Sequence, residues 1–125
     1  MGWKLLGLAI AGACGTLLRY GLAGVAQRAT DSGFPFGTAV VNLAGCFLAG
    51  LFWSYAQDRV SISAEMRTMI LIGFLGAFTT FSAFMLETSS LLRDAQWIWA
   101  VGNVLVQTVI GFALLFVGLA VGRLL

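Results

Sequence analysis

Polar side chains that could handle an ion lie inside long apolar stretches of the chain. Asn42, within GTAVVNLAG, could join two helices or present two amide donors to an anion, and the residues alone favour the first role. Arg19, within GTLLRY, could snorkel to a membrane interface, bond the carbonyls at a helix end or attract anions at a vestibule. Structural anchoring is the preferred interpretation of Arg19. Both residues are candidates because polar groups are costly in hydrocarbon.

The stretch GFLGAFTTFSAF, residues 73–84, carries the most informative pattern. Two glycines, two threonines, a serine and four phenylalanines stand where a plain membrane span would use leucine. Gly76 followed by the β-branched Thr79 and Thr80 has poor helix propensity, which predicts a break. A break at mid-bilayer must be buried in protein or line a cavity, and such breaks commonly bind ions. The alternative is a continuous helix with small residues at a packing seam.

Helical spacing extends this pattern along the chain. Phe81, Phe84 and then Glu87 or Thr88 would share one face that leads toward the aqueous end of the helix. Asn103 and Gln107, four residues apart, would form a second polar stripe in the last apolar stretch.

Composition identifies the solvent of these elements as lipid. Of 125 residues, 60% are hydrophobic and 10% are charged, and mean hydropathy is +0.97. A soluble domain carries about 25% charged residues. The chain has no histidine, which excludes an imidazole base, metal site or proton relay, and no soluble catalytic domain fits. The net charge of +2 is too small and dispersed for a nucleic-acid surface, so we expect neither an enzyme nor a nucleic-acid partner.

Four apolar stretches predict a single all-α transmembrane domain over residues 1–125. The expected spans cover about residues 3–26, 36–56, 67–92 and 97–122. Their connectors are shorter than ten residues, so neighbouring helices should be antiparallel. A secretory signal is the alternative for the start, from Lys4 and the Ala11-Gly12-Ala13 site, but the apolar pattern continues past it.

Charge gives only a weak orientation signal. Four spans put both termini and the middle connector on one side. That side holds Lys4, Arg59, Arg67 and Arg123 against Asp58 and Glu65, and the other side holds Arg28 and Arg93 against Asp31 and Asp94. Four basic residues against two permit a fixed orientation with both termini inside, or insertion both ways. Two oppositely inserted copies could pair as an antiparallel dimer.

Small residues predict close helix packing and self-association. In the first span they are Gly7, Ala11 and Gly15, and in the fourth they are Gly111, Gly118 and Gly122. Four short helices can barely enclose a pore, which indicates a homodimer.

The motifs GTLLRY, GTAVVNLAG and GFLGAFTTFSAF resemble those of the Fluc fluoride channels, small bacterial exporters of fluoride. The resemblance covers essentially the whole chain. It implies a multi-pass protein of the bacterial inner membrane that forms a dual-topology antiparallel homodimer with two fluoride pores. It further implies a structural sodium ion, Na⁺, held at the dimer interface by carbonyls of the broken third helices.

The resemblance also implies roles for individual residues. Asn42 would be the pore asparagine, and Phe81 and Phe84 would be the paired pore phenylalanines. Ser82 would belong to a polar track, and Glu87 would be the acidic residue beyond the phenylalanines. Gly76 and Thr79 would supply carbonyls to sodium, and Arg19 matches the arginine of the first helix. The chain departs from the family pattern at Ala77, Ala83 and Asn103. Asn103 stands where some members carry tyrosine, and its amide could partly replace hydroxyls lost from the track.

Two other classes compete with a fluoride channel. A dual-topology multidrug transporter would need a carboxylate in its first helix, which holds no Asp or Glu here, and Arg19 would repel a cationic substrate. A non-transporting membrane scaffold would account for the glycines and amides but leaves the phenylalanine–threonine pattern of the third span unexplained.

Overall fold

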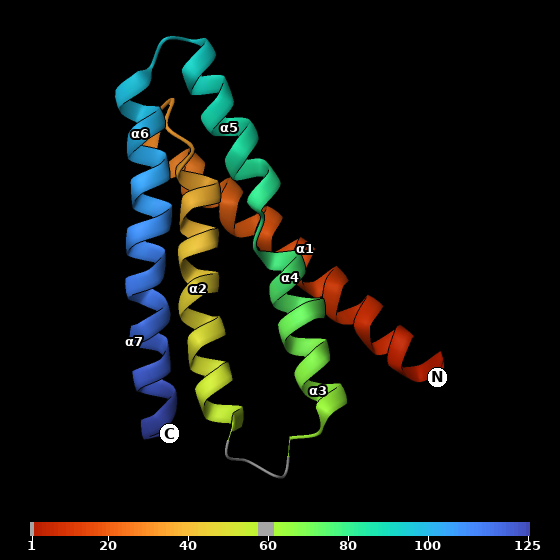
Figure 1. Cartoon of the computed structure of the whole chain (residues 1–125). Coiled ribbons are helices and arrows are strands. Elements are labelled where there is room, and N and C mark those ends of the chain that lie inside the picture. The colour runs from red at the N-terminus through yellow and green to blue at the C-terminus, as the bar shows by residue number, and fades with distance from the viewer. Residues whose placement is uncertain (1, 58–61) are drawn as a thin grey trace.

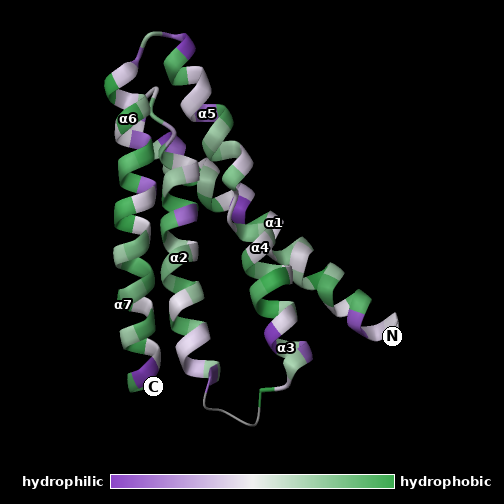
Figure 2. Cartoon of the chain, in the orientation of Figure 1, coloured by the Kyte–Doolittle hydropathy of each residue, from purple (hydrophilic) through white to green (hydrophobic). Residues whose placement is uncertain are grey.

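Four long apolar helices make up the computed structural model, which describes residues 2–57 and 62–125 (Figure 1). The first two are α1 (Gly2–Thr30) and α2 (Phe36–Gln57); the third comprises α3 (Ala64–Thr68), the π-helical η1 (Met69–Leu75), α4 (Gly76–Phe78) and α5 (Phe81–Arg93); the fourth comprises α6 (Trp97–Leu105), the π-helical η2 (Val106–Ile110) and α7 (Gly111–Leu124). Hydrophobic residues cover most of their length, and hydrophilic ones gather mainly at the ends (Figure 2). All four are long and apolar enough to cross a membrane, which confirms the predicted helical class.

The two ends of the chain lie at one end of the bundle, and the connections after α1 and α5 lie at the other (Figure 1). Helix α1 runs obliquely, and its N-terminal end splays away from α2 and α7 (Figure 1). Lys4 Nζ nevertheless donates to Glu65 Oε1 at 2.6 Å, which joins the start of α1 to α3. Asp58 and Arg59, used in the charge count, lie outside the described residues.

Helix α1 is longer than the sequence predicted. It continues past Ala26 to Thr30 and ends where Asp31 adopts a φ of 41°, a conformation that aspartate tolerates better than most residues. Arg19 therefore lies about three turns before the end of α1.

Gln27 instead organises the connection between α1 and α2. Its Nε2 donates to the carbonyls of Ser32 and Phe34 at 2.9 and 3.0 Å, and its Oε1 accepts from Gly37 N–H at 3.1 Å. One side-chain amide thus bonds two carbonyls of the connection and one N–H of the first turn of α2.

Glycines determine how closely the helices approach within the chain. A Cβ on Gly118 would collide with the Phe47 carbonyl, and one on Gly122 with the Leu51 carbonyl, so α7 lies directly against the backbone of α2. Gly15 likewise brings α1 against the Phe74 carbonyl of η1. Close approach is confirmed, but these glycines serve packing inside one chain. Self-association of two copies through the small residues stays a prediction.

The π-helical segments η1 and η2 were not foreseen from the sequence. Each lies within a long span, between α-helical turns at both of its ends. A π-bulge changes which residues share a face, because it adds a residue to one turn. In this fold, η2 contains Gln107 and follows directly on the α6 residues that include Asn103.

Candidate functional site

The backbone at Thr79 and Thr80 is extended, between the end of α4 at Phe78 and the start of α5 at Phe81 (Figure 1). Their φ and ψ angles are −90° and 157° for Thr79, and −147° and 114° for Thr80. In a continuous α-helix the Thr80 N–H would donate to the Gly76 carbonyl. Here it donates to Asn42 Oδ1 at 2.8 Å.

Asn42 of α2 satisfies both backbone groups of Thr80. Its Oδ1 accepts from the Thr80 N–H, and its Nδ2 donates to the Thr80 carbonyl at 3.1 Å. The Thr80 hydroxyl accepts from Ala83 N–H at 3.2 Å and so caps the new helix α5. The structure therefore gives Asn42 the inter-helix role that the residues alone favoured.

A row of side-chain hydrogen bonds leads away from Asn42 toward the end of α5. Asn42 Nδ2 donates to Gln107 Oε1 at 2.7 Å, and Gln107 Nε2 donates to Asn103 Oδ1 at 2.8 Å. Asn103 Nδ2 then donates to Thr88 Oγ1 at 2.9 Å, and the Thr88 hydroxyl donates to the Phe84 carbonyl at 2.7 Å. Asn103 is fully buried, with 0% exposure. The predicted polar stripe of Asn103 and Gln107 is confirmed.

A cavity of about 440 Å³ opens beside Asn42 and Gln107. Phe81 and Phe84 line it with their ring centroids 5.8 Å apart and their planes inclined by 63°. Phe81 is 73% exposed and Phe84 only 6%, so one ring stands at the surface of the chain and the other is packed inside it. The structure brings three predicted pore residues together here, and Gly76 and Thr79 line the same cavity.

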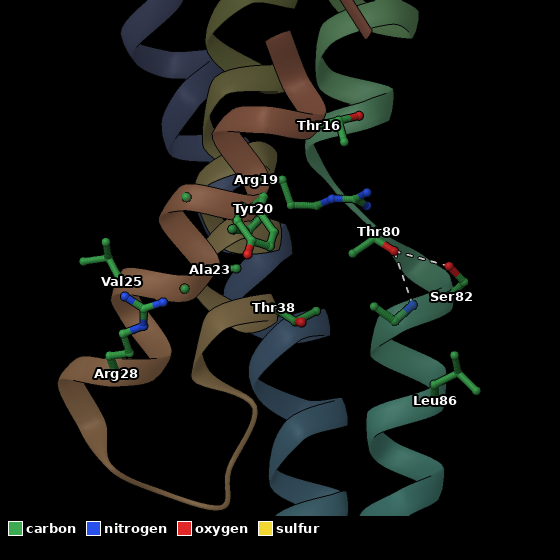
Figure 3. Close-up of a pocket in the computed structure, with 14 residues that line it drawn as sticks. Thr16, Arg19, Tyr20, Ala23, Val25, Arg28, Thr38, Thr80, Ser82 and Leu86 are labelled. Carbon is green, nitrogen blue, oxygen red and sulfur yellow. Dashed lines mark hydrogen bonds between the residues drawn. The ribbon is translucent and has the colours of Figure 1, made fainter. Parts of the chain in front are cut away.

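A second cavity, of about 850 Å³, also reaches the α4–α5 connection, since Thr80 lines both cavities (Figure 3). Arg19 and Arg28 of α1 line it together with Thr38, Thr80 and Ser82. Arg19 extends from α1 toward Thr80 (Figure 3). The hydroxyls of Thr80 and Ser82 are 3.3 Å apart. Ser82 is thus separated from the cavity that Phe81 and Phe84 line.

Glu87 and Asn103 line neither of these two cavities. Glu87 Oε1 accepts from the Thr38 hydroxyl at 2.6 Å, while its Oε2 is buried and has no hydrogen-bond partner among the described residues. Of the two candidates for the face of Phe84, it is Thr88 that bonds back to Phe84. Glu87 instead joins α5 to α2.

The sequence pattern predicts Gln107 as part of a polar stripe but not as a pore residue. It also missed Thr80, whose N–H and carbonyl organise the site. The spacing of Asn103 and Gln107 was the available signal, but that Gln107 meets Asn42 across 65 positions became visible only in three dimensions.

The cavity beside Asn42 can receive an anion without offering it a full charge. Its lining combines the amides of Asn42 and Gln107 with the rings of Phe81 and Phe84. Amide N–H groups donate hydrogen bonds, and the edge of a phenylalanine ring carries positive partial charge. No group of three or more His, Cys, Asp or Glu residues that could hold a metal occurs in the described ranges.

Comparison with known proteins places the chain in a family. The model of the family "CrcB-like protein, Camphor Resistance (CrcB)" matches residues 6–119. A relative from Desulforapulum autotrophicum is 52% identical over 122 residues, which cover 98% of each chain. Relatives from Solidesulfovibrio magneticus and Nitrosococcus oceani are 49% and 44% identical, also over 98% of each chain. All three are named fluoride-specific ion channel FluC.

These bacterial relatives and the four apolar helices identify a multi-pass protein of the bacterial inner membrane. The relatives carry the name of an ion channel rather than of an enzyme, in agreement with the exclusion of catalysis from composition. The chain belongs to the CrcB-like family.

Proposed function

We propose that this chain conducts fluoride across the bacterial inner membrane and so relieves the cell of a toxic anion. The observation that carries the proposal is the cavity in which Asn42, Phe81 and Phe84 converge beside the extended residues Thr79 and Thr80. Full-length similarity to proteins named fluoride-specific ion channels supports it. We take Thr79 and Thr80 to be the functional break of the third span.

Neutral groups suit the passage of fluoride. The ion is small and strongly hydrated, so a pore must replace its water with closely placed donors. Asn42 supplies an amide, and Phe81 and Phe84 supply ring edges that attract an anion without trapping it. A channel must bind firmly enough to admit the ion and weakly enough to release it. Arg19 and Arg28 would act earlier, by attracting anions into the larger cavity.

Purified protein in liposomes tests the proposal. We expect fluoride to leave loaded vesicles rapidly, and chloride to stay inside over the same period. Efflux of chloride at the rate of fluoride, or of neither ion, would contradict the proposal, and neither ion moving would favour a scaffold. Proton-coupled transport of a cationic dye would instead favour a multidrug transporter.

We further propose that two copies pair in opposite orientations and enclose two pores. The cavity beside Asn42 is open and Phe81 is exposed in the single chain, so a second copy could complete its wall. The weak charge bias is compatible with insertion both ways. A compartment-sensitive reporter on the C-terminus should give signals from both sides of the membrane, whereas one side alone would exclude dual topology.

A sodium ion would fit between the two copies beside the residues 76–80. The Thr80 N–H is diverted to Asn42, which releases the Gly76 carbonyl from its helical bond, and Gly76 is exposed. The Thr79 carbonyl lies in extended backbone, outside the helical ladder. Carbonyl oxygens are the ligands that unwound helices offer to cations. When bound, the ion would hold the two connections together by its charge.

Removal of sodium is the corresponding test. Replacing Na⁺ by N-methylglucamine on both sides of the liposome membrane should reduce fluoride efflux by about tenfold or more, because the assembled state loses the stabilisation that the bound ion gives it. Restoring Na⁺ should restore the efflux. Equal efflux in the two media, with vesicles verified as sodium-free, would contradict the sodium site and leave the fluoride pore standing.

A further inference from the structure

The hydrogen bonds around Asn42 can run in only one direction. The Thr80 N–H is a donor, so the atom of Asn42 that faces it at 2.8 Å must be the acceptor Oδ1. Nδ2 of Asn42 therefore donates, and Gln107 must receive it with Oε1. The same logic continues through Asn103 and Thr88 to the Phe84 carbonyl, which can only accept. A backbone donor and a backbone acceptor of one span thus fix every amide in the row.

This direction leaves Asn42 with no N–H to offer a further ligand. One of its two N–H groups goes to the Thr80 carbonyl and the other to Gln107 Oε1. An anion that enters the cavity and binds Asn42 must displace one of these two acceptors. The Thr80 carbonyl belongs to the backbone, whereas Gln107 has a flexible side chain on the wall of the same cavity. Gln107 is the acceptor that can move.

We propose that Gln107 Oε1 is an internal substitute for fluoride, which occupies the donor of Asn42 when no ion is present and yields it when an ion arrives. The inference rests on the proposed function. The oxygen lies 2.7 Å from Asn42 Nδ2, at the distance that a hydrogen-bonded anion would take. Asn103 acts as a positioning residue, because its Oδ1 accepts from Gln107 Nε2 and so turns Oε1 toward Asn42.

Such a substitute stabilises the empty pore and also helps the bound ion to leave. It keeps the Asn42 donor satisfied in the empty pore, where an unpaired amide in a water-poor site would be costly. It also competes with the bound ion, and thereby weakens binding enough for release. The competition predicts an unusual direction of change: removal of Gln107 Oε1 should make fluoride bind more tightly.

The test measures fluoride efflux of Gln107→Met over a range of fluoride concentrations. Methionine has nearly the same length, but its thioether sulfur is only a weak acceptor for the bond from Asn42. We expect the half-saturating fluoride concentration to fall by about threefold to tenfold, the equivalent of one net hydrogen bond. The maximal efflux should fall as well, because the ion leaves more slowly. A purely structural defect would lower the maximal efflux without lowering the half-saturating concentration.

Gln27→Met is the matched control, because Gln27 also joins its neighbours through a side-chain amide but lies outside both cavities. Its half-saturating concentration should equal that of the unaltered chain. An unchanged or higher value in Gln107→Met would overturn the inference while the fluoride channel itself stands. An unaltered chain that passes no fluoride would refute the channel instead.

Thermal melting in detergent tests the competition between Gln107 and fluoride if Gln107→Met passes too little fluoride to measure. At a given concentration, a ligand that binds the folded state more tightly raises the melting temperature more. Sodium fluoride should then stabilise Gln107→Met more than the unaltered chain, with sodium chloride as the reference salt. Equal or smaller stabilisation would overturn the inference.

Discussion

Replacement of Asn42 by leucine should abolish fluoride efflux and also weaken the fold. The N–H and carbonyl of Thr80 would lose their partners, as would Gln107 Oε1. Each unsatisfied polar group costs about 1–3 kcal/mol, so we expect the free energy of unfolding to fall by about 3 kcal/mol or more. The cavity would lose its amide donor at the same time, and efflux should fall by about a hundredfold or more, equivalent to about 2.7 kcal/mol in the barrier.

Gln27→Leu separates the two effects of this substitution. Gln27, like Asn42, satisfies three polar groups with one amide, but it holds the α1–α2 connection instead of lining a cavity. Gln27→Leu should lower the melting temperature in detergent to a similar degree and keep most of the efflux per folded protein. Equal loss of efflux in the two variants, at equal folded fraction, would mean that Asn42 acts through stability alone.

Replacement of Phe81 by isoleucine should reduce fluoride efflux by about tenfold or more, which corresponds to about 1.4 kcal/mol in the barrier for passage. Isoleucine fills similar space but has no ring edge with positive partial charge. Phe81 is 73% exposed in the single chain, so its loss should barely affect the packing of the four helices. The measurement is fluoride efflux from liposomes at matched protein content.

Phe112→Ile provides the comparison for Phe81→Ile. Phe112 is 66% exposed, close to the value of Phe81, and belongs to α7 instead of the cavity wall. Its substitution should leave fluoride efflux within about twofold of the unaltered chain, because exposed side chains away from a site contribute little and Phe112 does not line the cavity beside Asn42. If Phe81→Ile also stays within that range, the ring-edge role is refuted.

Much of the architecture could be predicted from local features of the sequence. The apolar runs determined four helices because a bilayer demands long segments whose backbone polar groups bond internally. Their lengths were less predictable. Helix α1 continues to Thr30 because Gln27 stabilises its end through contacts with the next connection, and no local pattern reveals that contact. The π-helical segments were equally invisible, since the same residues could form regular turns.

The contacts of the small residues could likewise be predicted only in part from the sequence. Glycine spacing predicted close approach of helices, and Gly118 and Gly122 do lie against α2. The spacing could not tell whether the neighbour would belong to the same chain or to another copy. That choice depends on which faces the short connectors bring together. In this fold they bring α7 against α2.

Composition predicts that the protein spans a lipid bilayer and that few polar residues lie within its spans, and local conformational preference predicts poor helix propensity at Thr79 and Thr80. The bonds of Asn42 to Thr80 and Gln107 become visible in the folded chain alone. The same holds for the place of Gln107, rather than Ser82, in the cavity of the two phenylalanines. The reason is that a hydrogen bond between distant segments depends on helix rotation and crossing, which packing across the whole bundle sets. Scarcity of charge is a property of the chain, whereas the direction of each amide is a property of the fold.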